Sequence, residues 1–318
     1  MKKKFEFVQK WSSEVDPGLA NTPNKTIQRN IKRRAVNVNK VDFYKGVPIP
    51  TWIELSLIDT CNRACVFCPR SDDKIAPNTH QQMEGPLIKK LVQDLKEMNF
   101  KGAINLCGYG EPMLHKKINS IISKLSEVAS VEIVTNGDTL NSKKLQELEK
   151  SGISKILISL YDGEHQISEM ENLIKDSKID RDLVDLRDRW YSEDEDYGLA
   201  LSNRAGTVKS RKPSVTSSMR SRKDTPTPTK CFYPSYSLMV EWNGDIFLCP
   251  NDWQRKVAQG NMMQKSIKDI WSGKMITKYR KKLLSGKRED SPCKECNASG
   301  ILLGGSHANE WEKYYNLK

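Results

Sequence analysis

Three cysteines in the first third of the chain have a spacing that suits metal chemistry. Cys61, Cys65 and Cys68 are separated by three residues and then two, in the run Cys-Asn-Arg-Ala-Cys-Val-Phe-Cys-Pro. A loop with this spacing can turn three thiolates toward one point but supplies no fourth. Cubane iron–sulfur clusters usually take four thiolates, one per iron, so this loop would leave one iron open to a small molecule. An open metal position is a feature of catalytic sites.

A second group of cysteines offers four thiolates and therefore a closed site. Cys293 and Cys296 form a Cys-Lys-Glu-Cys pair, while Cys231 lies in an extended segment and Cys249 ends a predicted hairpin strand. The spacing alone is compatible with structural zinc or with an iron–sulfur cluster. Beside an iron–sulfur loop we favour a second cluster, which would accept an electron or stabilise the fold.

The elements that must position these residues alternate between strands and helices. Apolar patterns predict strands at Trp52–Leu57, Ala103–Cys107, Val131–Thr135 and Ile156–Leu160, with helices at Leu87–Met98, His115–Val128 and Ser142–Lys150 between them. This alternation predicts parallel βα units, whose functional loops lie at the C-terminal ends of the strands. Each candidate motif follows a strand in turn: Cys61–Cys68, Gly108–Pro112, Asn136–Asp138 and Ser159–Gly163.

Regularity weakens after about residue 170. Residues 207–230 are rich in Ser, Thr, Pro and basic side chains, which predicts a mobile loop. Beyond them, Asn243-Gly244 between two short apolar runs predicts a β-hairpin. We therefore divide the chain into an N-terminal extension (1–48), a core (49–206), a linker loop (207–230) and a C-terminal domain (231–318).

Composition narrows the class of protein. The N-terminus is basic but lacks the apolar segment of a signal peptide, no apolar run approaches a membrane span, and mean hydropathy is −0.64. Eight cysteines in 318 residues are too few for a small disulfide scaffold, so a cytoplasmic protein with reduced thiols is the simplest interpretation. The net charge of +12 arises from bases interleaved with acids, which makes nucleic-acid binding a weak hypothesis and leaves room for an anionic substrate.

Together these motifs resemble the radical S-adenosylmethionine (SAM) enzymes. The cysteine loop, Gly110-Glu-Pro112 and Thr135-Asn-Gly137 match the family's strand-end motifs, and the four-cysteine half resembles its short auxiliary-cluster domain, the twitch form of the SPASM type. The resemblance covers roughly residues 50 to 300. It implies a partial (β/α)6 barrel followed by a small C-terminal iron–sulfur domain built from a β-hairpin and helices.

Within that family the chain is similar to the 2-deoxy-scyllo-inosamine dehydrogenases, which oxidise an aminocyclitol alcohol to a ketone. The shared elements include Tyr109-Gly-Glu-Pro112, Thr135-Asn-Gly-Asp138, Leu201-Ser-Asn-Arg204 and Cys293-Lys-x-Cys296. The similarity implies an oxidoreductase that acts on a hydroxylated carbon of a sugar or cyclitol.

The resemblance also implies the cofactors. Cys61, Cys65 and Cys68 would hold a [4Fe–4S] cluster whose open iron chelates SAM, and one electron would convert SAM into a 5′-deoxyadenosyl radical. Glu111 and the carbonyls around it would accept hydrogen bonds from the SAM ammonium, while Asn136 and Ser159 would contact its ribose or carboxylate. The expected cofactor contacts are Gly110, Glu111, Pro112, Asn136, Ser159 and Asn203. The second [4Fe–4S] cluster would accept an electron, and a flavodoxin or ferredoxin would supply the first.

Arg204 and Tyr109 are the expected substrate contacts. Arginine is a poor base because its pKa is so high, so Arg204 would polarise the hydroxyl while water or another group takes the proton. A structural salt bridge, or binding of the SAM carboxylate, is the alternative for Arg204.

Three other functions stay open from the sequence. Cys107, outside both cysteine groups, is most simply a small buried side chain, but as a hydrogen-atom donor it would make the protein an epimerase. A peptide-modifying maturase is a second alternative, although four C-terminal cysteines are few for two auxiliary clusters. The third is a non-catalytic zinc or nucleic-acid binder.

Overall fold

A single sheet of parallel strands organises the molecule. The computed structural model describes residues 25–65, 67–189, 202–208 and 230–317. Within them, one eight-stranded sheet has the order β10-β9-β8-β3-β4-β5-β6-β7. Its strands are β3 (Trp52–Leu55), β4 (Ala103–Leu106), β5 (Ser130–Thr135), β6 (Lys155–Leu160), β7 (Val184–Asp188), β8 (Ser237–Val240), β9 (Asp245–Phe247) and β10 (Ala258–Asn261). The strands from β8 to β7 are parallel, and β9 and β10 add antiparallel edges.

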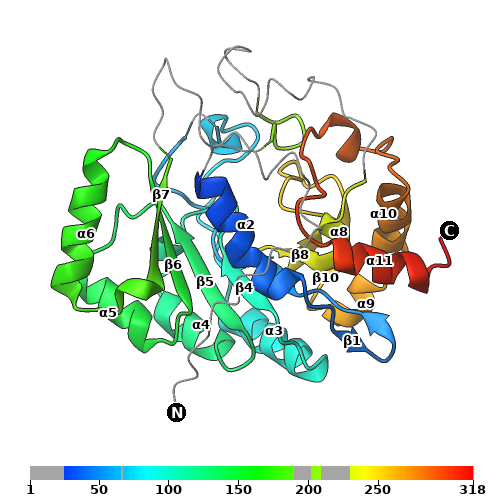
Figure 1. The fold of residues 1–318 in the computed structure, drawn as a ribbon, viewed down its shortest axis with the longest axis horizontal. Coiled ribbons are helices and arrows are strands. Elements are labelled where there is room, and N and C mark those ends of the chain that lie inside the picture. Colours follow the sequence, from blue (N-terminus) through cyan, green and yellow to red (C-terminus); the bar gives the residue numbers. More distant parts are fainter. Residues whose placement is uncertain (1–24, 66, 190–201, 209–229, 318) are drawn as a thin grey trace.

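Helices link successive strands of this sheet and cover its outer face (Figure 1). They are α3 (Gly85–Glu97), α4 (Ile118–Leu125), α5 (Ser142–Lys150) and α6 (His165–Ser177). The predicted α/β fold is thereby confirmed. The sequence patterns did not predict α6 and β7, which continue the alternation beyond residue 160.

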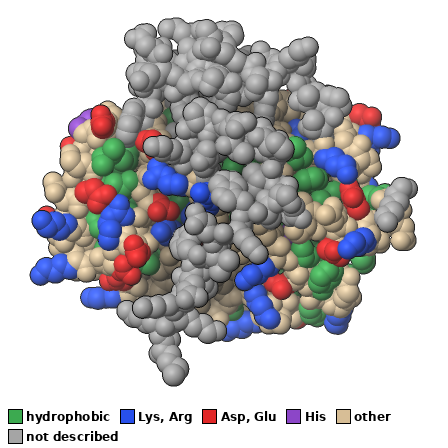
Figure 2. Space-filling view, in the orientation of Figure 1, with side chains coloured by type: hydrophobic (Ala, Val, Ile, Leu, Met, Phe, Trp, Pro, Cys, Tyr) green, Lys and Arg blue, Asp and Glu red, His purple; other side chains and the backbone are tan. Residues whose placement is uncertain are grey.

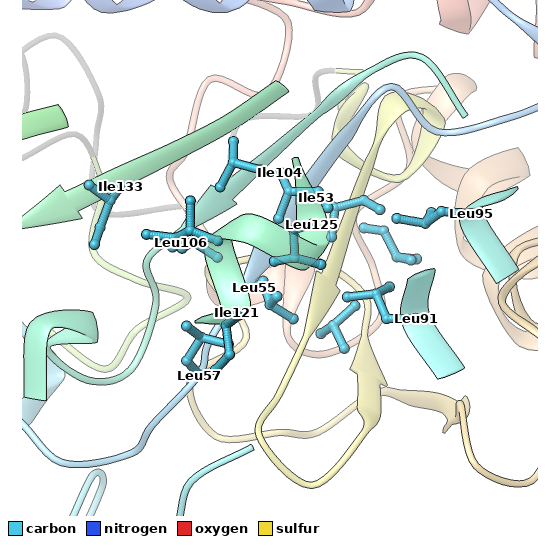
Figure 3. Close-up of a cluster of buried hydrophobic side chains, with 14 of the residues drawn as sticks. Ile53, Leu55, Leu57, Leu91, Leu95, Ile104, Leu106, Ile121, Leu125 and Ile133 are labelled. Carbon is cyan, nitrogen blue, oxygen red and sulfur yellow. The ribbon is translucent and has the colours of Figure 1, made fainter. Parts of the chain in front are cut away.

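The main core lies between the sheet and these helices. Figure 3 shows Ile53 and Leu55 of β3 close to Leu91 and Leu95 of α3, and all four are fully buried. Leu91 and Leu95 are four residues apart, so they occupy one face of the helix. Burying such a side chain contributes about 1.5–3 kcal/mol, and the core therefore fixes the strand ends that carry the candidate site.

The C-terminal hairpin is continuous with the core sheet. Strand β8 pairs in parallel with β3, in the register Trp52↔Ser237 to Leu55↔Val240. The hairpin lies in the predicted C-terminal domain (231–318), and its first strand completes the row of six parallel strands. Beside it lie α8 (Tyr233–Tyr236), α9 (Ile267–Trp271), α10 (Lys274–Leu284) and α11 (Gly305–Tyr314).

Helix α2 (Lys25–Val38) crosses the inner face of the sheet, ahead of a small hairpin formed by β1 (Phe43–Tyr44) and β2 (Val47–Pro48). Its Arg33 pairs with Glu132 of β5, and its Arg34 pairs with Glu54 of β3 at 3.4 Å. Glu54, Asn105 and Glu132 are in register across three neighbouring strands, so they share one face of the sheet. The helix is thus anchored by charge over the interior of the barrel.

The surface carries both signs of charge. Figure 2 shows Lys and Arg side chains interspersed with Asp and Glu on one face of the molecule. Among the described residues, no helix has the length and apolar character needed to cross a membrane.

Candidate active site

One cavity of about 470 Å³ lies at the C-terminal ends of the parallel strands. Ten of the predicted site residues line it: Cys61, Cys65, Cys68, Cys107, Tyr109, Gly110, Glu111, Asn136, Ser159 and Arg204. Pro112 and Asn203 lie just outside the lining, and the four C-terminal cysteines line a second, smaller cavity. The structure therefore brings together residues that are separated by up to 143 positions in the sequence.

The three-cysteine loop is held at its first thiol by Asn78. The Asn78 side chain accepts a hydrogen bond from the Cys61 N–H at 3.0 Å and donates one to the Cys61 carbonyl at 3.2 Å. Buried Arg70 reinforces this arrangement, because its guanidinium donates to Asn78 and to the Tyr109 carbonyl. The loop thus has a defined geometry set by residues outside the cysteine motif.

Arg63, between the first two cysteines, forms a clamp that the sequence did not reveal. Its guanidinium donates to both carboxylate oxygens of Asp138 at 2.6 and 2.7 Å, and to both of Asp162 at 2.7 Å. These paired hydrogen bonds raise the pKa of Arg63 far above its usual value. Since Asp138 follows β5 and Asp162 follows β6, the clamp ties the cluster loop to two neighbouring strand ends.

The backbone of the Gly110-Glu111 turn packs directly against the backbone that precedes Cys61. A Cβ on Gly110 would lie 2.7 Å from the Thr60 carbonyl oxygen and closer still to that of Ile58, so only glycine fits here. The buried Glu111 carboxylate accepts hydrogen bonds from Met113 N, Asn136 N and Thr135 Oγ1, at 2.7 to 2.9 Å. Burial nevertheless raises its pKa.

The carboxylate of Glu111 thus caps the 3₁₀ turn Pro112–Leu114 and joins it to the end of β5. Asn136 continues the connection, because its amide donates to the Asn62 Oδ1 at 2.8 Å and its oxygen accepts from Asp138 N at 3.0 Å. Ser159 is fully buried near the end of β6, on the cavity wall. These strand-end residues therefore form a connected frame around the cysteine loop.

Tyr109 connects the first half of the chain to the second. Its hydroxyl donates to the Asp252 carbonyl at 3.1 Å, and its ring packs edge-on against Trp253 with centroids 4.4 Å apart. The guanidinium of Arg255 lies 4.6 Å from the ring centroid. Burial is the largest cause that raises the pKa of the Tyr109 hydroxyl, which therefore stays protonated.

Cys107 faces the same cavity with its thiol surrounded by polar groups. Asn105 donates to its sulfur at 3.1 Å, and the thiol donates to Glu54 Oε2 at 3.5 Å. Burial, followed by the charge of Glu54, raises the pKa of this thiol well above its usual value. Cys107 is therefore a neutral thiol on the cavity wall.

Asn203 and Arg204 lie on a turn that joins the two halves of the protein. Asn203 is bound to the C-terminal segment, because its N–H donates to Asn297 Oδ1 at 2.7 Å and its amide donates to the Glu295 carbonyl at 2.8 Å. Arg204 has φ of +48°, and the turn aims its side chain into the main cavity. Its positive charge lowers the pKa of Cys68, although burial raises that pKa by more.

The four C-terminal cysteines line one small cavity, together with Ala205, Leu248 and Arg288. The Arg288 guanidinium donates to the Ala298 carbonyl at 2.8 Å and lines the cavity at the same time. Burial raises the pKa of Cys231 to about 11, so a thiolate here requires a bound cation. Iron would supply that charge.

Two kinds of metal centre take thiolate ligands in these numbers. Among the described residues, no group of three or more His, Cys, Asp or Glu side chains fits a single metal ion. Zinc needs four sulfurs about 2.3 Å from one point, whereas a cubane cluster takes each thiolate on a different iron. The loop offers three thiols and the C-terminal cavity four, which are the numbers that an open and a closed cluster take.

The two cavities share a wall. Asn251 and Ala298 line both of them, and Arg204 lines the larger one while its neighbour Ala205 lines the smaller. Tyr233 is also common to both linings, so the larger cavity, which contains the three-cysteine loop, is adjacent to the cavity among the four cysteines. The protein thus has the features of an iron–sulfur enzyme: an open three-thiolate site and a closed four-thiolate site beside it, at the end of a parallel barrel.

Comparisons with known proteins identify the family to which this iron–sulfur enzyme belongs. The Radical SAM superfamily model matches residues 55–181, and the SPASM model, an iron–sulfur cluster-binding domain, matches residues 231–297. The S-adenosyl-L-methionine-dependent 2-deoxy-scyllo-inosamine dehydrogenase of Niallia circulans is 31% identical over 250 residues, which cover 77% of this chain and 92% of the relative. The chain belongs to the radical SAM superfamily and is a radical SAM enzyme of the oxidoreductase type.

Two further similarities agree with this assignment. The crystal structure of BtrN in complex with AdoMet and 2-DOIA matches with a TM-score of 0.64 and 27% identity, and covers 82% of this chain and 98% of that one. The GTP 3′,8-cyclase of Clostridium perfringens strain SM101 is 28% identical over 112 residues, 34% of each chain. The predicted family, SAM and both iron–sulfur clusters are thereby confirmed.

Sequence reasoning missed several cavity residues. Helix α2 contributes Arg33 and Arg34, and β7 contributes Arg187 with Arg189 directly after it. Alternating charged residues in Val184-Asp-Leu-Arg-Asp188 obscured the strand. The inward side chains of β7 are polar because they face the cavity and α2. The pairing of β7 with β6, which identifies it as a strand, cannot be read from the sequence.

Proposed function

We propose that this enzyme oxidises a hydroxylated carbon of a sugar or cyclitol to a ketone. The shared wall between the two cavities carries this proposal. A substrate in the larger cavity lies between the three-cysteine loop and the layer that covers the four-cysteine cavity. The relative from Niallia circulans is named for dehydrogenation of 2-deoxy-scyllo-inosamine, an aminocyclitol, which supports the substrate class.

The residues divide the work. When bound, the SAM-ligated cluster supplies one-electron cleavage of SAM, which yields the 5′-deoxyadenosyl radical that removes one hydrogen atom from the carbinol carbon. The substrate must then lose one proton and one electron. Arg204 binds the substrate oxygen and stabilises the negative charge that develops on it, while a water molecule takes the proton. Cys231, Cys249, Cys293 and Cys296 would hold the second cluster, of the twitch type, which would accept this electron across the wall at Asn251 and Ala298.

The Gly110–Pro112 turn, Asn136, Ser159 and Asn203 support the site around SAM in this proposal. Glu111, Asn136 and Asn203 hold their neighbouring segments through the hydrogen bonds described above, so they keep the pocket in shape. Tyr109 closes the cavity against Trp253. A cytoplasmic flavodoxin or ferredoxin supplies the electron that starts each turnover.

The experiment is a product balance. Cluster-loaded protein is incubated anaerobically with reductant, SAM and 2-deoxy-scyllo-inosamine, along with a panel of cyclitols, sugars and their phosphate monoesters. One 5′-deoxyadenosine per ketone is the expected ratio, and release without any ketone across the whole panel would refute the dehydrogenase.

An epimerase is the second candidate, because Cys107 is a neutral thiol on the wall of the same cavity. A thiol, unlike a thiolate, carries the hydrogen atom that an epimerase must return to the substrate radical. Turnover in D2O would then place deuterium at one inverted carbon, and Cys107→Ala would abolish it. A ketone formed at an unchanged rate by Cys107→Ala would exclude this mechanism.

A further inference from the structure

Arginines surround the cavity in excess over the acids that balance them. Of the residues that the structure describes, seven arginines line it, against two glutamates. Arg33, Arg34 and Arg63 pair with carboxylates, as described above. Arg70 donates its hydrogen bonds to the carbonyls of Ala76 and Tyr109 and to the Asn78 side chain. The remaining three are Arg187, Arg189 and Arg204.

Arg187 and Arg189 lie on the wall made by β7. Arg187 is in register with Ser159 of β6, so their side chains share the inner face of the sheet. Arg187 is 9% exposed. The buried Nε atoms of both arginines lack a hydrogen-bond partner among the described residues, and neither guanidinium forms an ion pair with a carboxylate in that part of the chain. A buried charge without a partner costs several kcal/mol, which a bound anion would offset.

Neighbouring positive charges increase this cost. Burial is the first cause that lowers the pKa of Arg187 to about 10, and the charge of Arg33 adds to it. Burial also lowers the pKa of Arg189 to about 9, with Arg187 as the next cause. The positive charges of these cavity-lining arginines therefore oppose one another.

SAM does not account for this charge. It brings one carboxylate, which a single guanidinium can bind, and it also brings an ammonium and a sulfonium, both of which are cationic. At least one of the arginines would remain uncompensated with SAM in place. Among the described residues no further carboxylate pairs with these arginines, and the substrate is the other ligand that can bring negative charge into the cavity.

We propose that the substrate carries a phosphate group, and that Arg187 and Arg189 bind it. A phosphate monoester has close to two negative charges and three acceptor oxygens, which match two planar guanidinium donors better than one carboxylate does. Arg204, on the turn that precedes Ala205, then binds the reacting oxygen. This inference rests on the proposed function, because it names the substrate class of the same site: a phosphorylated sugar or cyclitol.

The test is a comparison of matched ligands by calorimetry on the full-length, cluster-loaded protein with SAM bound. The pairs are myo-inositol 1-phosphate with myo-inositol, and glucose 6-phosphate with glucose. We expect the phosphorylated member of at least one pair to bind more than about 10-fold tighter than its neutral partner, since hydrogen bonds to a buried charge are strong. Equal affinities within both pairs would overturn the proposal.

Variants locate the site. Arg189→Gln should lose about 10-fold or more of the preference for the phosphorylated ligand while SAM affinity stays unchanged. Arg181→Gln is the control, because Arg181 is a half-exposed arginine that pairs with Glu171 at 2.6 Å outside the cavity. Weakened SAM binding in Arg189→Gln, with the ligand preference intact, would overturn the proposal and assign this arginine to the SAM carboxylate.

A measurement on the unmodified protein guards against misfolded variants. A low concentration of inorganic phosphate should raise the melting temperature relative to sodium chloride at the same ionic strength, because a ligand of the folded state stabilises it while the general stabilising effect of phosphate is small at low concentration. An identical melting temperature in both salts would count against the anion site. A preference for phosphorylated ligands without release of 5′-deoxyadenosine would uphold the site and refute only the proposed reaction.

Discussion

Replacing Gly110 by alanine tests how tightly the strand-end loops define the cysteine site. Gly110 follows β4, and the new Cβ would lie 2.7 Å from the Thr60 carbonyl oxygen, directly before Cys61. An ordinary van der Waals contact begins at 3.4 Å, so these two segments must separate by at least about 0.7 Å. Both are backbone held by hydrogen bonds, such as Glu111 N to Thr60 O at 2.9 Å, and neither can rotate away.

Two effects follow from this separation. Overpacking of this kind costs about 1–3 kcal/mol of stability. Displacing reacting groups by a comparable distance can cost about 100-fold in rate. We therefore expect Gly110→Ala to reduce iron incorporation at the first site and to slow release of 5′-deoxyadenosine by about 100-fold.

Gly102→Ala is the matched control. Gly102 precedes the same strand β4, and its added Cβ would lie 2.6 Å from the Thr51 carbonyl carbon, at the opposite end of the sheet from the cysteines. Both variants should lose similar stability in urea unfolding. Folded Gly102→Ala should retain wild-type SAM cleavage, because its clash does not reach the cluster loop.

Two results would contradict the prediction for Gly110→Ala. Wild-type iron content and SAM cleavage in Gly110→Ala would show that the close approach does not define the site. An equal loss of cleavage in folded Gly102→Ala would show that any strain on β4 has the same effect.

Three further predictions concern the frame around the site. Arg63→Lys keeps the charge but loses the two-sided hydrogen bonding to Asp138 and Asp162, so iron loading should fall several-fold by metal analysis while Arg181→Lys loads normally. Glu111→Gln places an amide donor among three donors, which should lower the urea-unfolding free energy by about 1–3 kcal/mol; an unchanged midpoint would refute the buried network. Burial lowers the pKa of His307 to about 4, below that of an unfolded histidine, so the folded state excludes a proton that the unfolded state binds between pH 4 and 6.5. Stability should therefore fall as pH drops through this window, by up to about 3 kcal/mol, and His307→Asn should show less of that fall in urea unfolding at pH 7 and pH 5.

The sequence predicted the parts of the fold that rest on local patterns. Alternation predicted the strand at Trp52–Leu57, a short apolar run predicted the one at Ile156–Leu160, and the stripe containing Leu91 and Leu95 predicted α3. It failed at β7, whose inward positions are polar because they face α2 and the cavity. The course of α2 was also beyond local patterns, since its anchors Glu54 and Glu132 are 20 and 99 residues away from Arg34 and Arg33.

In the candidate site too, local sequence patterns reveal some residues, while others depend on contacts between distant segments. Cysteine spacing reveals ligands directly, because a cluster requires thiols at short intervals in a loop. Arg63 has no such signature, since its partners Asp138 and Asp162 follow other strands. The contacts of the Asn203 side chain with residues 295–297 likewise lie beyond what local patterns reveal. Arg187 and Arg189 point to an anion site only once the structure shows that they form no ion pair with a carboxylate among the described residues.

The central claim is that the three-cysteine loop starts the radical reaction and the four-cysteine site does not. The most direct test is release of 5′-deoxyadenosine from reduced, iron-loaded protein incubated with SAM alone. We expect release from the wild type and from Cys231→Ala, and none from Cys61→Ala. Release from Cys61→Ala at the wild-type rate would contradict the account.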